Sequence, residues 1–159
     1  MPTSDQGDAQ ADVDPDPFAS ARGRTRFGAQ APIIAVVAAG GALGACARYG
    51  LGLLWPTASG AFPVTTLGVN IVGCAIMGVF MVLITEVWTA HRLLRPFVGT
   101  GILGGFTTFS TYTVDITHLI STGRVAAGAA LLAATPLATL AATWATASLT
   151  SYLATRRAR

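Results

Sequence analysis

The fold is decided in residues 104–112, which read GGFTTFSTY and lie inside a segment otherwise apolar enough to cross a membrane. The adjacent Gly104 and Gly105 favour a helix break, because a residue without a Cβ adopts backbone conformations that other residues avoid. In hydrocarbon every N–H and C=O that leaves a helix needs another partner, so irregular backbone is tolerated only inside protein or beside a water-filled cavity. The stretch therefore predicts either an ion site at mid-membrane or a close helix–helix contact built from small residues.

The composition is that of a membrane protein. Mean hydropathy is +0.59 and charged residues are only 11% of the 159 residues, which excludes an ordinary soluble domain. All ten basic residues are Arg, and they flank apolar runs instead of forming one stripe, so the net charge of +3 does not indicate a nucleic-acid partner. Cys46 and Cys74 lie in apolar segments and are interpreted as small buried side chains.

Four apolar stretches are long enough to cross the lipid bilayer as helices, which takes about 20 residues each. They cover residues 32–54, 63–85, 97–121 and 125–153. Residues 1–30 combine low hydrophobicity with Pro and charge, which predicts a disordered cytoplasmic tail. The sequence thus predicts an all-α integral membrane protein, with its membrane domain over residues 31–154 and a basic C-terminal tail over residues 155–159.

The distribution of arginines predicts the orientation in the plasma membrane. The N-terminal tail, the second connection and the C-terminal tail share one side and hold eight of the ten arginines, whereas the other side has Arg48 and Arg124. Loops rich in Lys and Arg stay in the cytoplasm. Both termini of this multi-pass protein are therefore predicted to be cytoplasmic.

Polar residues inside the spans are the candidates for function, because they are costly in hydrocarbon. Arg48, near the end of the first span, either snorkels to the interface or attracts an anion at the mouth of a pathway. Asn70, the only Asn of the chain, lies one helical turn after Thr66, so both can face the same way. A hydrogen bond between helices is the simpler interpretation of Asn70.

Aromatic rings and hydroxyls offer further contacts for a small anion. Phe109 and Tyr112 share a face if this part is helical, and ring edges carry partial positive charge. Thr135 and Thr139 share a face of the fourth span, where Pro136 would free a backbone carbonyl one turn earlier. Ring packing and back-bonding of hydroxyls onto their own helix are the alternatives. No catalytic set, metal cluster or nucleotide-binding motif occurs in the spans, so we expect no enzyme.

Three motifs in order resemble the CrcB/Fluc family of fluoride channels. They are Gly40-Gly41-x-x-Gly44-Ala45-x-x-Arg48-Tyr49, Thr66-Leu67-x-Val69-Asn70-x-x-Gly73 and Gly104-Gly105-x-Thr107-Thr108-Phe109-Ser110-Thr111. The resemblance covers residues 33–153. It implies four transmembrane helices with a broken third helix, in an antiparallel dimer with one copy inverted against the other. It also implies passive export of fluoride, which relieves fluoride toxicity in the cytoplasm.

The resemblance further implies roles for individual residues. Backbone carbonyls of Gly104 and Thr107 would hold a structural Na⁺ that is not transported, which suits a hard cation. Arg48 would lie at a vestibule or have a structural role. The fluoride path would be lined by Asn70, Phe109, Tyr112, Thr66, Thr135 and Thr139.

The sequence departs from the family pattern at two positions. The usual Gly before Thr66 is Thr65, and the usual second Phe is Tyr112. The Tyr112 hydroxyl would add a donor to the path or narrow it. From the sequence alone, Tyr112→Phe is expected to conserve or raise fluoride efflux.

The partner subunit is the remaining alternative. An inverted homodimer needs chains that insert both ways, whereas an arginine bias of eight to two favours one orientation and hence a paralogous partner of opposite orientation. A non-conducting or regulatory subunit of such a heterodimer is the alternative function. A small multidrug exporter is not favoured, because the first span lacks the carboxylate that proton coupling needs.

Overall fold

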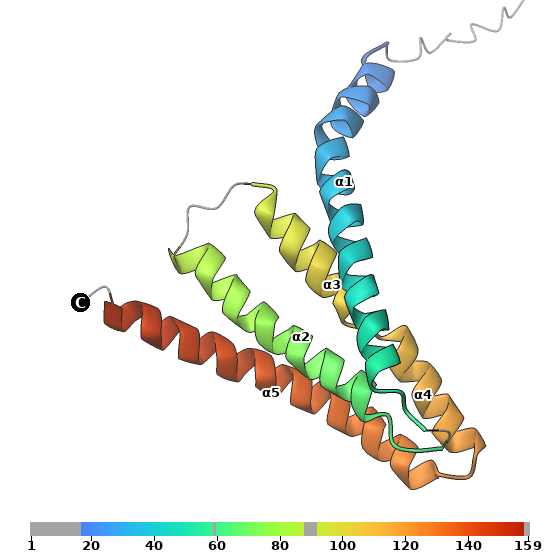
Figure 1. Ribbon diagram of the computed structural model, residues 1–159. Coiled ribbons are helices and arrows are strands. Elements are labelled where there is room, and N and C mark those ends of the chain that lie inside the picture. The colour runs from blue at the N-terminus through green and yellow to red at the C-terminus, as the bar shows by residue number, and fades with distance from the viewer. Residues whose placement is uncertain (1–16, 59, 88–91, 158–159) are drawn as a thin grey trace, which may run out of the picture. The chain divides into compact units, whose positions relative to one another are not determined.

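The computed structural model describes residues 17–58, 60–87 and 92–157, and over these ranges it is helical without strands (Figure 1). The elements are α1 (Pro17–Leu54), α2 (Val64–Val82), η1 (Leu83–Val87), η2 (Arg95–Leu103), α3 (Gly104–Phe106), α4 (Ser110–Ser121) and α5 (Val125–Arg157). Elements η1 and η2 are π-helices. The chain divides into two compact units, residues 1–32 and 33–159, and the break and the cavities described below belong to the second.

The N-terminal segment is only partly described. Helix α1 begins at Pro17, so residues 17–30 are helical although we predicted disorder for residues 1–30. Residues 1–16 lie outside the described residues.

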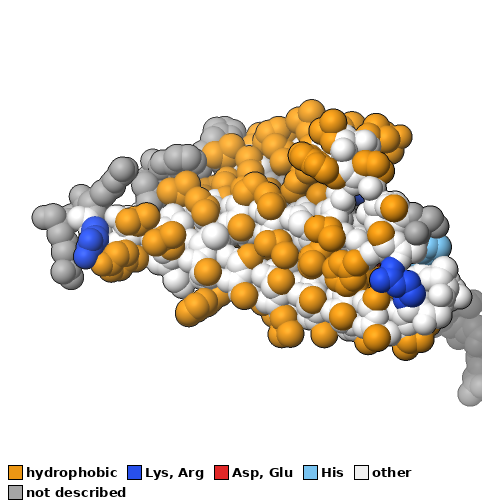
Figure 2. Space-filling model, turned by 60° about the horizontal axis from the view of Figure 1, so that its bottom comes forward, with side chains coloured by type: hydrophobic (Ala, Val, Ile, Leu, Met, Phe, Trp, Pro, Cys, Tyr) orange, Lys and Arg blue, Asp and Glu red, His pale blue; other side chains and the backbone are white. Residues whose placement is uncertain are grey.

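Three helices are long and apolar enough to span a membrane. They are Gln30–Leu54, Val64–Glu86 and Val125–Arg156. Large apolar side chains such as Leu54, Leu140 and Trp144 are exposed on them, and Figure 2 shows hydrophobic side chains spread widely over one face. Such surfaces are unfavourable in water but need no cover in hydrocarbon. The prediction of an all-α, multi-pass membrane protein is therefore confirmed.

The third predicted span is not one continuous helix. Elements η2 and α3 run to Phe106, α4 starts at Ser110, and Thr107 is extended, with φ −74° and ψ 157°. We call residues 107–109 the break. The turns before it are wide, since the Gly104 N–H bonds to the carbonyl of Gly99, five residues back. Short π-helical segments of this kind occur frequently at functional sites.

Helix packing fixes both sides of the break. Helix α2 runs along α5, and α4 packs on α5 through a buried cluster of Tyr112, Ile116, Leu119 and Leu131 (Figure 1). On the other side of the break, η2 and α3 contact α2. The break therefore lies between two helical pieces that each pack on other helices.

Small residues bring α1 close to the helices before the break. A Cβ on Gly44 would collide with the Ile102 carbonyl and lie 2.7 Å from the Phe106 nitrogen. A Cβ on Gly105 would collide with the Gly41 carbonyl. The close contact of small residues, one of the two interpretations of GGFTTFSTY, is thus present at Gly105, while the residues that follow leave the helix.

Candidate functional site

The side chain of Asn70 binds the backbone of the break. Its Nδ2 donates to the Thr108 carbonyl at 2.9 Å, and the Thr108 N–H donates to its Oδ1 at 2.7 Å. Asn70 is only 5% exposed, so both bonds are shielded from solvent. An amide side chain carries both a donor and an acceptor and can therefore satisfy a backbone residue that has left its helix. Asn70 thus connects α2 to the backbone of the break and not to a second helix, which the sequence did not indicate.

The backbone carbonyls of residues 104–107 lose their helical N–H partners at the break. In a continuous helix the Thr108 N–H would bond to the Gly104 carbonyl, and the Thr111 N–H to the Thr107 carbonyl. Here the first N–H bonds to Asn70, and the second bonds to the Thr108 hydroxyl oxygen at 3.1 Å. The released carbonyls include those of Gly104 and Thr107, the two predicted sodium ligands, while the Gly105 carbonyl accepts a bond from Arg48.

Hydroxyl side chains order the backbone on both sides of the break. The Thr107 hydroxyl donates to the Leu103 carbonyl at 2.9 Å, in the turn before the break. The Thr108 hydroxyl donates to the Thr111 hydroxyl at 3.1 Å and lies 3.3 Å from that of Ser110. The Thr108 hydroxyl also accepts a bond from the Thr111 N–H, which lies in the first turn of α4 and has no partner within that helix. These hydroxyls thus stabilise an irregular backbone.

A cavity of about 420 Å³ adjoins the break, and we call it the break cavity. Five of the six predicted path residues line it, namely Asn70, Phe109, Tyr112, Thr135 and Thr139. The sixth, Thr66, lines a separate cavity of about 320 Å³ together with Arg48, Thr108 and Thr111. The structure thus brings together residues from α2, α4 and α5 and places Thr66 beside the predicted vestibule residue instead.

The two aromatic residues differ in exposure. Phe109 is 79% exposed and Tyr112 only 6%, and their ring centroids are 5.6 Å apart with planes tilted by 53°. The Tyr112 hydroxyl donates to the Leu132 carbonyl at 2.9 Å. Its single proton is therefore not available to a ligand in the break cavity.

The threonines of α5 also differ from each other. The Thr139 hydroxyl bonds back to the Thr135 carbonyl at 2.9 Å, which is the alternative that the sequence left open. The Thr135 hydroxyl is buried in a residue that is 7% exposed, and it has no hydrogen-bond partner among the described residues. A buried hydroxyl without a partner costs about 1–3 kcal/mol. Its presence on the wall therefore favours a polar occupant of the break cavity.

Arg48 is half-buried, and its Nε donates to the Gly105 carbonyl at 3.3 Å. The residues alone predicted snorkelling or anion attraction for Arg48, and the family resemblance implied a vestibule or structural role; the bond observed is to the backbone before the break. The guanidinium also lines the 320 Å³ cavity, where it gives the wall a positive charge. Arg48 is therefore placed to act both on the break and on an anion near it.

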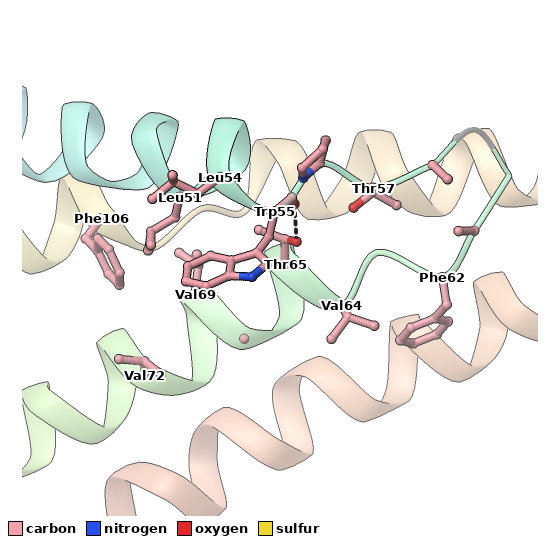
Figure 3. A pocket seen from close by; sticks show the side chains of 14 residues that line it. Leu51, Leu54, Trp55, Thr57, Phe62, Val64, Thr65, Val69, Val72 and Phe106 are labelled. Atoms are coloured by element: carbon pink, nitrogen blue, oxygen red, sulfur yellow. Dashed lines mark hydrogen bonds between the residues drawn. The ribbon is translucent and has the colours of Figure 1, made fainter.

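A larger cavity, of about 750 Å³, lies between the end of α1, the loop after it and α2 (Figure 3). Its walls are mainly apolar, with Trp55, Val69 and Phe106 among them, and the Thr65 hydroxyl donates to the Trp55 carbonyl at 2.7 Å. None of the predicted site residues lines it. Its chemistry suits apolar groups, so the polar site is the break cavity.

Comparisons with known proteins agree on one family. The family model described as CrcB-like protein, Camphor Resistance (CrcB), matches residues 35–147. A relative from Streptomyces coelicolor, named fluoride-specific ion channel FluC 1, is 63% identical over 126 residues, which are 79% of this chain and 82% of the relative. One from Streptomyces avermitilis, named fluoride-specific ion channel FluC 2, is 62% identical over 117 residues, or 74% of each chain. A second from that organism, FluC 3, is 45% identical over 122 residues, which are 77% of this chain and 58% of the relative.

Proposed function

This chain belongs to the CrcB family, and from that premise we propose that it forms a fluoride-specific ion channel. The observation that carries the proposal is the break cavity, where an amide, a ring and an unpartnered hydroxyl from three helices face one space. The related proteins are named as ion channels, so the chain is not an enzyme. Fluoride would leave the cytoplasm through this channel down its own gradient.

The donors on the cavity wall suit a small, strongly hydrated anion. Asn70 uses one amide hydrogen on the Thr108 carbonyl and has a second one left. The Thr135 hydroxyl has its proton free of any partner in the described part of the chain. The edge of the Phe109 ring adds partial positive charge. Together these groups can replace water around fluoride.

A structural Na⁺ fits the carbonyls that the break releases. We propose that Gly104 and Thr107 from each of two inverted subunits hold this ion at the centre of an antiparallel dimer. Neutral backbone oxygens are suitable ligands for a hard cation. In this arrangement residues 95–121 would form the third span, broken at its middle. The only role of the ion would be structural, since its positive charge would hold together the breaks of the two subunits.

Exchange of Na⁺ for N-methyl-D-glucamine is expected to abolish fluoride efflux, because the bulky cation cannot bind between carbonyls. Efflux is measured with a fluoride electrode on proteoliposomes after exhaustive exchange on both sides, and re-addition of Na⁺ should restore it. Equal efflux without Na⁺ would rule out a required sodium site while leaving the fluoride channel itself intact.

The orientation and the partner are proposed from the arginines. A bias of eight to two favours one fixed orientation, with both termini in the cytoplasm. A second subunit of opposite orientation would then complete the dimer. The two relatives in Streptomyces avermitilis, FluC 2 and FluC 3, support the availability of such paralogues in one organism.

Fusions to the C-terminus are expected to report a single orientation. A fluorescent protein, which matures in the cytoplasm, should give signal, and an alkaline phosphatase, which is active only outside, should give none. Comparable signals from both reporters would contradict fixed topology and favour an inverted homodimer.

The function itself can be tested in cells. Deleting the gene for this chain from its host is expected to raise the fluoride that accumulates in the cytoplasm, and re-expression should lower it again. Unchanged accumulation after deletion would argue against a role in fluoride export.

A further inference from the structure

In the interior of the α5 helix, one carbonyl loses its helical N–H donor. Residue 136 is Pro, and α5 continues through it. Proline has no N–H, so the carbonyl of Leu132, four residues earlier, loses its helical donor. The Tyr112 hydroxyl supplies the missing donor from α4, at 2.9 Å. Leu132, Pro136 and Tyr112 all line the break cavity, so this carbonyl lies at its wall.

We propose that Tyr112 is a positioning residue that masks the Leu132 carbonyl from the break cavity. The proposal rests on the proposed fluoride function. An unmasked carbonyl would present partial negative charge to a cavity that must admit an anion. It would also be a buried acceptor without a partner, which is unfavourable in itself. The tyrosine hydroxyl removes both problems with one hydrogen bond.

The same bond fixes the aromatic wall. Tyr112 is buried in the cluster that joins α4 to α5, and the bond to Leu132 adds a directional contact to this packing. The ring is thereby held in its tilted contact with Phe109, at 5.6 Å between centroids. The hydroxyl therefore acts on α5 and on ring orientation, and it donates no proton to the anion. This changes the expectation from sequence, in which Tyr112→Phe conserves or raises efflux.

A double-mutant cycle between Tyr112→Phe and Pro136→Ala tests the proposal. Tyr112→Phe alone is expected to slow fluoride efflux roughly tenfold and to lower the unfolding midpoint by at least about 2–4 °C. Pro136→Ala restores an N–H that can bond to the Leu132 carbonyl within the helix. In that background Tyr112→Phe should therefore have little effect on either quantity. Tyr152→Phe removes the same atom from an exposed tyrosine of α5 and is the matched control, expected to match the parent.

The proposal would be overturned if Tyr112→Phe lowered fluoride efflux and the unfolding midpoint equally with and without the Pro136→Ala substitution. It would also be overturned if Tyr112→Phe lowered neither quantity when Pro136 is present. If the effect of Tyr112→Phe on the unfolding midpoint depends on Pro136 but all four proteins show the same fluoride efflux, the masking role is overturned. If Tyr112→Phe alone gives no folded protein, recovery of folded protein by Pro136→Ala supports the proposal, and no recovery overturns it. The unfolding midpoint does not depend on conduction. If the two substitutions have coupled effects on the midpoint but the parent protein shows no fluoride efflux, the proposed function is refuted and the hydrogen bond is not.

Discussion

Asn70→Ala is expected to reduce fluoride efflux by roughly 30-fold or more, because it removes both partners of the Thr108 backbone. The Thr108 N–H and carbonyl lose their bonds at 2.7 Å and 2.9 Å in a buried site. Two unpaired buried groups cost the conformation with the open break about 1 kcal/mol or more each, and a cost of about 2 kcal/mol lowers the population of that conformation roughly 30-fold. The Thr108 N–H would then be free to bond to Gly104, which would close the break and remove a proposed sodium ligand.

The measurement is initial fluoride efflux from proteoliposomes at equal amounts of folded protein. Thr117→Ala is the control, since its exposed hydroxyl bonds only to the Thr113 carbonyl of its own helix. Asn70→Asp keeps the Oδ1 acceptor but loses the amide donor and places a negative charge at the break cavity, so it should also be strongly impaired. Normal efflux in Asn70→Ala would show that the break does not depend on this side chain.

Gly44→Ala is expected to prevent assembly of the native fold. A Cβ there would collide with the Ile102 carbonyl and lie 2.9 Å from the Ile102 carbonyl carbon. These atoms are backbone, so they cannot move aside as the end of a flexible side chain can. To relieve this collision, α1 would have to move away from η2 and α3, and the break would lose the packing that supports it.

Gly41→Ala provides the matched comparison, because a Cβ at Gly41 meets no atom within 4 Å. The two glycines belong to the same motif of the same helix and receive the same methyl group. We expect size-exclusion chromatography in detergent to show folded protein for Gly41→Ala and aggregate or none for Gly44→Ala. A well-behaved Gly44→Ala protein would contradict the close packing of α1 described above.

The membrane spans could be predicted because their signals are local. Long apolar runs of sequence predict three of the membrane-spanning helices. The predicted span ends at Leu54 and Ser121 coincide with the ends of α1 and α4. Both ends have a nearby cause in the sequence. Pro56 has no N–H for the helical hydrogen bonds and disfavours helical backbone at the residue before it. Gly123 adopts a positive φ of 78°, which favours glycine.

The bonding within the site could not be predicted, because it depends on neighbours that are distant in sequence. Adjacent glycines indicated a helix break, but nothing local shows that Asn70 would bond to Thr108, which lies 38 residues later. The π-helical turns of η2 also have no simple signature in composition. The sequence did indicate a freed carbonyl before Pro136, yet only the packing of α4 on α5 shows that Tyr112 bonds to it.

The most direct test of the central claim, that this chain forms a fluoride-specific path beside its break, is ion release from proteoliposomes. The complex is purified from native membranes through a tag on this chain, so that a paralogous subunit, if present, is retained. Liposomes loaded with equal fluoride and chloride are diluted into a medium free of both, and each ion is followed with its own electrode. We predict rapid fluoride release with chloride retained. Fluoride release no faster than from protein-free liposomes, or release of both ions together, would contradict the claim.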